Sequence, residues 1–406
     1  MKTISSIKGL VVAQAAVNGG MITNFGGIVA RRLVEEGASL HVFASRYPVF
    51  GSPPPLAELD ALGAIYHGVS LPEQFAPLRD AWTVFRMAWE LKRLGVHVLH
   101  TRGAVMGAVG RVAGKLAGVP IIFHHQDDLY CREKRLTPNQ RRTVAAFERS
   151  LSRLTDRTFF VSQAVLDEAI ANGFDPSRCV LAGNDLTESF QQAALSPKNP
   201  SNGILRHLFR LGVPESAKII GCIGRLAHIK GMDILIEAAS QVLQEFPEWI
   251  LLIKGNGPLL GPLSDTIKER GLIGRIFLLP EDLPAWELPA LYRTFDLFVL
   301  PTRREGFGMV FAEAMAMGVP VVGPNIAPVT EVVPQDCGIL VGPEDPVELA
   351  GVMRQVMADG SLRASLAVRG REHAMRRWCG RTTAADNALA TYRAIIAEKS
   401  LSNQLA

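Results

Sequence analysis

The chain of 406 residues contains no apolar run of about 18–20 residues, the length that a membrane-spanning helix needs. It has only five cysteines, an odd number without a C-x-x-C pair, which argues against a disulfide framework or a zinc site and favours a reducing compartment. It also lacks low-complexity tracts and short internal repeats. Hydrophobic residues make up 48% and charged residues 20%, which excludes a disordered or fibrous protein. At this length we expect two core-forming domains.

The amino terminus, residues 1–16, carries two lysines followed by GLVVAQAA and faintly resembles a signal peptide. Its apolar stretch is short and leads directly into a Gly-Gly loop, so we predict a first buried strand instead. The net charge of +4 comes from the first half, where residues 1–200 hold 22 Lys and Arg against 17 Asp and Glu. This bias suits an anionic partner, and a solvated basic face remains the alternative.

Short apolar runs alternate with amphipathic stretches in both halves of the sequence. Runs such as VPIIFHH and WILLIKG are continuously apolar rather than alternating, which is typical of strands in parallel sheets that helices cover on both faces. Between the two halves, SPKNPSNG has the composition of a linker. We therefore predict an α/β protein with two Rossmann-like domains.

The strongest motif is EGFGMVFAEAMAMGVPVVG, residues 305–323. It predicts a glycine-flanked turn, a helix over residues 309–317 and a following strand. Such a turn places free backbone N–H groups at the carboxyl edge of a parallel sheet, where they can bind an anion. Glu313 would lie inside the helix among apolar neighbours, and we expect a partner for its carboxylate; a solvated helix position is the alternative reading.

Two further motifs are weak alone but meaningful in their order. Gly224-Arg225 and Lys230-Gly231 place two cations on one strand-to-helix loop, a combination suited to a diphosphate. Gly255-Asn256-Gly257-Pro258 follows the next strand and predicts a tight turn. Each motif alone is also compatible with an ordinary surface loop.

Together these motifs resemble the retaining glycosyltransferases of glycosyltransferase family 4, most clearly over residues 216–350. The resemblance implies the GT-B fold, with two Rossmann-like domains facing across a cleft and a carboxy-terminal helix returning to the first domain. The implied boundaries are residues 1–195 for an acceptor domain, 196–216 for a linker, 217–375 for a nucleotide-sugar domain and 376–406 for the returning helix.

The resemblance also implies roles for residues of this chain. Arg225 and Lys230 would neutralise the diphosphate as it leaves, Glu305 would hold the donor sugar, and Glu313 would accept hydrogen bonds from the ribose. We count Glu305, Arg225 and Lys230 as catalytic candidates. The expected donor-binding residues are Gly19, Gly20, Gly255, Asn256, Gly257, Gly306, Phe307, Gly308, Met309 and Glu313.

On the acceptor side the candidates are His124, His125 and Asp127. The family's histidine loop does not align uniquely here, and each histidine is as readily a structural residue as a functional one. No Asp-x-Asp and no His/Cys cluster with ligand spacing occurs. We therefore expect no cofactor and a metal-independent reaction, with the nucleotide sugar as a substrate.

The resulting functional prediction is a retaining transferase that moves a sugar from a nucleotide-diphosphate sugar to a glycan, lipid-linked or small-molecule acceptor, in cell-surface polysaccharide or glycolipid synthesis. A non-catalytic nucleotide-sugar-binding homologue and a GT-B epimerase remain alternatives. A dehydrogenase is disfavoured because no G-x-G-x-x-G follows the first strand. No nucleic-acid partner is expected, and the base and sugar of the donor stay open.

Residues 77–95 predict a helix that carries aromatic and basic residues together. Its apolar members are Trp82, Phe85, Met87, Trp89 and Leu91, and its cations are Arg79, Arg86, Lys92 and Arg93. A basic tract follows later, with Arg132, Lys134, Arg135, Arg141, Arg142 and Arg149. Aromatic residues beside cations suit an anionic membrane surface, but an amphipathic helix that covers the sheet explains the pattern equally well. We expect a cytoplasmic protein, with peripheral contact at the inner face of the membrane left open.

Overall fold

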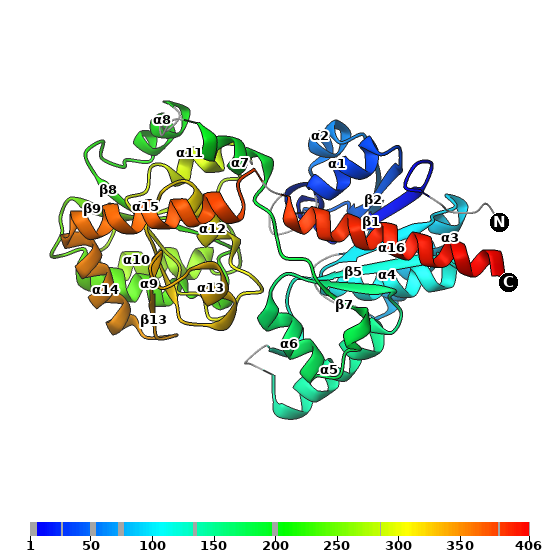
Figure 1. Ribbon diagram of the computed structural model, residues 1–406. Coiled ribbons are helices and arrows are strands. Elements are labelled where there is room, and N and C mark those ends of the chain that lie inside the picture. Colours follow the sequence, from blue (N-terminus) through cyan, green and yellow to red (C-terminus); the bar gives the residue numbers. More distant parts are fainter. Residues whose placement is uncertain are drawn as a thin grey trace. The chain divides into compact units, whose positions relative to one another are not determined.

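In the computed structural model of the chain, the structure describes residues 6–25, 27–48, 54–71, 77–132, 136–196, 202–284, 286–380 and 382–405. The chain divides into two compact units, shown in Figure 1. The first unit comprises Met1–Asp185 with Thr382–Ala406, and the second comprises Leu186–Arg381. Each unit is built around one parallel sheet, as the continuous apolar runs predict.

The first unit holds a seven-stranded parallel sheet with the order β3-β2-β1-β4-β5-β6-β7. Its strands are β1 (Val11–Ala15), β2 (Ser39–Ser45), β3 (Ile65–Val69), β4 (Val98–Arg102), β5 (Ile121–Gln126), β6 (Arg157–Phe160) and β7 (Cys179–Leu181). The first apolar run is therefore a buried central strand, as predicted, since four of the five residues of β1 are buried.

Helices connect these strands and cover the sheet. They are η1 (Met21–Phe25), α1 (Gly27–Glu35), α2 (Leu56–Ala61), α3 (Pro77–Arg93), α4 (Ala104–Ala117), η2 (Tyr130–Arg132), α5 (Pro138–Ser152), α6 (Gln163–Ala171) and η3 (Pro176–Arg178). A capping box begins α5, where Thr137 and Gln140 each accept a backbone N–H of the other.

The last helix, α16 (Thr383–Leu405), also belongs to the first unit. Its Leu389, Tyr392 and Ile396 are buried in one apolar cluster with residues of β1, β2, β4 and β5. Asp185, at the end of the first stretch of this unit, accepts hydrogen bonds from the backbone of Ala384 and Ala385 at 3.1 and 2.9 Å. The carboxylate thereby satisfies orphan N–H groups at the start of α16.

The second unit holds a six-stranded parallel sheet with the order β10-β9-β8-β11-β12-β13. Its strands are β8 (Lys218–Ile223), β9 (Trp249–Lys254), β10 (Ile276–Leu279), β11 (Leu297–Val299), β12 (Val321–Pro324) and β13 (Gly338–Val341). Its helices are α7 (Glu188–Leu195), α8 (Asn202–Arg210), η4 (His228–Lys230), α9 (Met232–Val242), α10 (Leu260–Glu269), α11 (Leu288–Tyr292), α12 (Met309–Ala316), α13 (Ala327–Val332), α14 (Pro346–Ala358) and α15 (Gly360–Arg377).

The unit boundary lies ten residues before the predicted end of the first domain at residue 195, because α7 packs with the second unit. The segment predicted as a linker, residues 196–216, contains α8. Ile204 and Leu208 of this helix are 1% exposed, so they belong to the apolar interior of the second unit. Within the described ranges, no helix is both long and apolar enough to cross a membrane.

Both sheets reverse their strand order beside a central strand. The reversal lies between β1 and β4 in the first unit and between β8 and β11 in the second. In open parallel sheets, ligands bind outside the carboxyl ends of the strands at such a reversal, because the loops of the two strands diverge there. The loops after these four strands are therefore the places to search for a site.

Candidate functional site

In the second unit, an ion pair joins the loops that follow β8 and β11. The Lys230 ammonium lies 2.6 Å from Oε1 of Glu305, and the two side chains are 22% and 10% exposed. Arg225 lies on the same loop as Lys230, with an exposed side chain. The structure thus brings together the loops that carry all three catalytic candidates at the strand-order reversal.

The glycine turn after Glu305 leads directly into α12, as the motif predicts. Gly308 precedes the helix with a φ of 100° and, as a glycine, has no side chain that could cap the first turn of α12. The helix ends before Gly318, which has a φ of 73°. The first turn of α12 therefore presents backbone N–H groups beside the Lys230–Glu305 pair, which is suitable for an anion.

The two weaker motifs are parts of one structure. A Cβ atom at Gly255 would lie 1.9 Å from the carbonyl oxygen of Gly224, and one at Gly257 would lie 2.5 Å from that of Leu226. The backbones also bond directly, since the N–H of Leu226 donates to the carbonyl of Asn256 at 2.9 Å. Glycine is required at both positions because the turn after β9 supports the backbone of the loop that carries Arg225.

Glu313 has the buried partner that its apolar neighbours led us to expect. The Tyr292 hydroxyl donates to Oε2 of Glu313 at 2.7 Å. Burial raises the pKa of Glu313 to about 7, and the hydrogen bond from Tyr292 opposes part of that rise. The sequence predicted a partner but could not name Tyr292, which lies 21 residues earlier on another helix.

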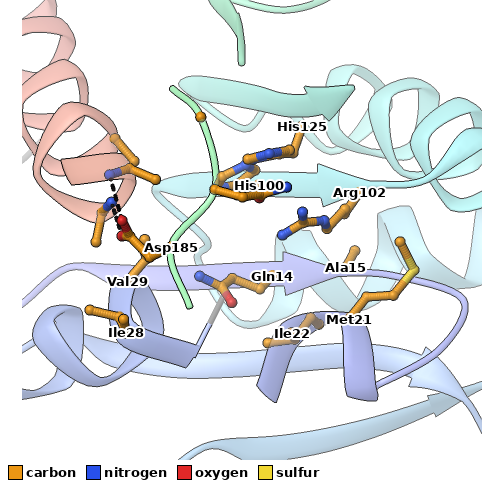
Figure 2. A pocket seen from close by; sticks show the side chains of 15 residues that line it. Gln14, Ala15, Met21, Ile22, Ile28, Val29, His100, Arg102, His125 and Asp185 are labelled. Atoms are coloured by element: carbon orange, nitrogen blue, oxygen red, sulfur yellow. Dashed lines mark hydrogen bonds between the residues drawn. The ribbon is translucent and has the colours of Figure 1, made fainter. Parts of the chain in front are cut away.

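The first unit has a pocket at its own strand-order reversal. Figure 2 shows side chains from β1, β4 and β5 converging on it. The polar lining comes from Gln14, His100, Arg102, His125, Asn184 and Asp185, and the apolar lining includes Met21, Ile22, Ile28 and Val29. The start of α16 closes one side with Ala384, Ala385 and Ala388. Few polar groups within an apolar lining are typical of a small-molecule site.

The two candidate histidines have different surroundings. His124 is 1% exposed, and its ring nitrogens lie 2.9 Å from the Thr101 hydroxyl and 3.0 Å from Oε1 of Gln126. Both nitrogens are therefore hydrogen-bonded within the first unit. His125 lines the pocket, and its buried Nε2 has no hydrogen-bond partner among the described residues. Burial holds the pKa of both rings well below 6.5. Of the two, His125 is placed to meet a ligand.

Asp127 is held by a guanidinium instead of pointing freely to solvent. Arg102 donates from Nε and a terminal nitrogen to the Asp127 carboxylate, with contacts of 3.0 and 2.6 Å. Arg102 itself is 7% exposed and lines the pocket. The pair fixes the donor-rich guanidinium at the pocket wall.

Several polar pocket residues escaped the sequence reasoning, among them Arg102, Gln14 and His100. Gln14 is a polar residue in the apolar strand VVAQA, is 5% exposed, and directs its amide into the pocket (Figure 2). His100 lies on β4, where its Nδ1 is 2.8 Å from the Tyr392 hydroxyl of α16. The available signal was a polar residue within a buried strand: Gln14 is the single polar residue of β1, and His100 begins the polar end of β4.

The remaining donor candidates, Gly19 and Gly20, lie in the loop after β1. The N–H of Gly20 donates to the Asn18 side chain at 2.8 Å, and η1 follows with two pocket residues, Met21 and Ile22. The placement of Gly19 and Gly20 beside the transferred sugar stays a prediction. In the part of the chain that the structure describes, no three His, Cys, Asp or Glu side chains are grouped to hold a metal ion.

Comparisons with known proteins agree with this division into two units. A family model described as Glycosyl transferases group 1 matches residues 205–373, and one described as Glycosyl transferase 4-like domain matches residues 19–185. Over 373 residues the chain is 29% identical to a D-inositol 3-phosphate glycosyltransferase of Salinispora arenicola, an alignment that spans 85% of this chain and 81% of that protein.

A second relative and a solved structure extend the comparison. The chain is 29% identical to a GDP-mannose-dependent alpha-(1-6)-phosphatidylinositol monomannoside mannosyltransferase of Mycolicibacterium smegmatis over 223 residues. This alignment spans 53% of this chain and 56% of that protein. The fold is similar to that of Anabaena HepE, solved with UDP and glucose, with a TM-score of 0.73, 19% identity and coverage of 98% of this chain and 100% of that chain. This likeness and the two parallel sheets confirm the predicted fold class.

Proposed function

Because the chain belongs to the group 1 glycosyltransferases of glycosyltransferase family 4, enzymes that use a nucleotide-sugar donor, we propose that it transfers the sugar with retention of configuration to a hydroxyl group of a small polyol or glycan acceptor. The observation that carries the proposal is the Lys230–Glu305 ion pair, which joins the end of η4 to the loop that leads to the first turn of α12, whose N-cap residue is Gly308. Lys230 and Arg225 place two cations where a diphosphate leaving group would develop negative charge, and Glu305 holds the Lys230 ammonium in position.

Each donor residue then has a distinct task. Lys230, Arg225 and the N–H groups of α12 stabilise the departing diphosphate, while Glu305 orients both Lys230 and the donor sugar. Glu313 binds the ribose hydroxyls, and Tyr292 holds its carboxylate in place. The pair of glycines after β9 keeps the Arg225 loop in position. The catalytic effect rests on charge stabilisation instead of a covalent nucleophile.

The pocket of the first unit is proposed as the acceptor site. Gln14 and His125 offer hydrogen-bonding groups without a formal charge, since the pKa of His125 lies well below 6.5. Such groups suit hydroxyls, which both donate and accept. The inositol-containing acceptors named for the two relatives have many hydroxyls and support a polyol or sugar ring as the acceptor.

Nucleoside diphosphates are expected to raise the thermal midpoint of the protein by several degrees in a concentration-dependent way, because they bind the folded state only. A melting screen with UDP, GDP and ADP, and with their sugars, measures this and identifies the base. The best donor is then incubated with cyclic polyols and free sugars, and NMR assigns the anomeric configuration of the product. No stabilisation by any diphosphate would contradict the donor assignment, and an inverted product would contradict retention.

Activity is expected to be unchanged in excess EDTA. The leaving diphosphate is stabilised by Arg225, Lys230 and the start of α12, so no divalent ion has to supply that charge. Initial rates with the identified donor, after chelation and with added Mn²⁺ or Mg²⁺, measure the dependence. Loss of activity that either metal restores would contradict the prediction.

A further inference from the structure

Helix α3 has two apolar faces, and only one of them packs on the first unit. Met87 and Leu91 are 1% and 0% exposed and belong to the apolar cluster between α3, α4 and the sheet. Trp82, Phe85 and Trp89 are 66%, 64% and 66% exposed. Covering the sheet therefore explains Met87 and Leu91 but leaves the three aromatic residues unexplained.

The exposed aromatic residues form one stripe along the helix. Positions 82, 85 and 89 follow the i, i+3, i+7 spacing, which places them on a single face roughly opposite to Leu91. Single exposed apolar residues are ordinary, but three large aromatic side chains in one stripe form a contiguous patch, and such patches mark interaction sites.

Cations border the stripe on both sides. Arg86, Lys92 and Arg93 are exposed, and the guanidinium of Arg93 lies 5.4 Å from the centre of the Trp89 ring. Of its acidic residues, Asp80 is 2% exposed and paired with Arg79, and Glu90 is 26% exposed and lies 3.4 Å from His67 and 3.9 Å from the Arg93 guanidinium. Arg86 and Lys92 then carry most of the uncompensated positive charge. The exposed face is therefore aromatic and positively charged.

We propose that this face of α3, defined by Trp82, Phe85, Trp89, Arg86, Lys92 and Arg93, is a docking surface for an anionic lipid bilayer. Tryptophan and phenylalanine insert at the level of the lipid headgroups, and the flanking cations pair with anionic headgroups. A second copy of the chain fits poorly, because two identical faces would bring the same cations together across the contact. The protein then binds the membrane surface through one helix.

The basic tract later in the first unit has a different character. Arg132 is used internally, with ion pairs of 2.8 Å to Asp128 and 2.9 Å to Glu168. Arg141 and Arg142 are exposed on α5 without an aromatic stripe beside them, and Lys134 and Arg135 lie outside the described residues. Arg141 and Arg142 thus provide a matched control for charge alone.

Vesicle flotation tests the docking surface without any transfer reaction, so its outcome is independent of the proposed function. Vesicles of phosphatidylcholine with and without 30% phosphatidylglycerol are compared at low and high salt. We expect binding to the anionic vesicles at low salt and weak binding to the neutral ones. The triple variant Trp82→Ala/Phe85→Ala/Trp89→Ala should bind about tenfold or more weakly, whereas Trp286→Ala, which removes an exposed tryptophan of the second unit, should bind normally.

The charge contribution is read from a pair of double variants. Arg86→Glu/Lys92→Glu should weaken binding to anionic vesicles about tenfold or more, and Arg141→Glu/Arg142→Glu should have little effect. Circular dichroism and donor-induced stabilisation verify that each variant is folded. The proposal is overturned if the unmodified protein does not bind anionic vesicles at low salt, if the α5 variant loses as much as the α3 variant, or if the triple variant abolishes a dimer instead of vesicle binding.

Discussion

Lys230→Ala is expected to lower kcat/KM for the donor by about ten- to a hundredfold, which corresponds to the roughly 1.5–3 kcal/mol of a charge-assisted hydrogen bond. The substitution removes the ammonium that faces the diphosphate. It also leaves the Glu305 carboxylate, which is 10% exposed, without its 2.6 Å partner and close to an incoming anion. Steady-state kinetics over a range of donor concentrations measures the loss.

A second substitution at Glu305 separates the two contributions to this loss, namely the missing Lys230 ammonium and the negative charge that remains on Glu305. If repulsion from the Glu305 carboxylate adds to the loss once the Lys230 ammonium is gone, Lys230→Ala/Glu305→Gln should bind the donor more tightly than Lys230→Ala, although its turnover stays low. Lys218→Ala is the matched control, because Lys218 begins β8 at the opposite end of the strand and is 43% exposed. Unchanged kcat/KM in Lys230→Ala, or an equal loss in Lys218→Ala, would remove Lys230 from the site.

The first unit is expected to lose stability steeply as the pH falls below 6.5. Burial lowers the pKa of His41, His100, His124 and His125, in the case of His100 to about 3. A histidine of this kind takes up its proton only on unfolding, so its stabilising contribution is present above the unfolded pKa and is lost below it. Each such group contributes a slope of up to about 1.4 kcal/mol per pH unit, which it reaches only below its unfolded pKa. The four together therefore remove at most about 4 kcal/mol between pH 6.5 and 5.5, a large part of a domain's stability.

Two carboxyl groups act in the opposite direction at lower pH. Burial raises the pKa of Glu148 and Asp185, so as the pH falls the folded state takes up these protons first, and it gains stability above the unfolded pKa values near 4 to 4.5. This gain opposes the loss caused by the histidines wherever the two pH ranges overlap, so the two carboxyl groups reduce the net fall in stability and do not add to it.

Urea unfolding at pH 7.5, 6.5 and 5.5 measures this dependence, and hydrogen exchange assigns it to a unit. The second unit is the internal control, because His373 is its one histidine with a lowered pKa among the described residues. Strand β5, which carries His124 and His125, should lose amide protection at pH 5.5 before β9 does. A first unit that keeps its midpoint from pH 7.5 to 5.5 would contradict the expectation.

Local motifs were the most predictable part of this protein. The turn before α12, its start at Met309 and the glycine after it follow from residue types within a few positions, because helix ends are decided by neighbouring residues. The contact between the turn at Gly255 and the loop at Gly224 could not be predicted in the same way. It depends on β8 and β9 being neighbours in register, and no residue near either turn signals it.

The alternation of side chains along a strand also explains why the sequence left both His124 and His125 as candidates. Neighbouring residues of a strand point to opposite faces, and a continuously apolar strand gives no sign of which face holds a pocket. Helix α3 posed the same problem, since apolar residues occur on two faces and only the contacts of Met87 and Leu91 show which face is covered.

Helix α8 was predicted as part of a linker because its amphipathic pattern directly follows a segment rich in proline, asparagine and serine.

The return of α16 to the first unit has a consequence for biosynthesis. Tyr392 and Leu389 fill the same apolar cluster as β1 and β4, yet the ribosome makes them after all of the second unit. The usual order, in which the amino-terminal domain folds first, cannot be completed here. The nascent first unit must wait with an uncovered apolar surface while the second unit, continuous in sequence, finishes folding ahead of it. Chaperone binding during translation should therefore concentrate on the part of the chain that emerged earliest.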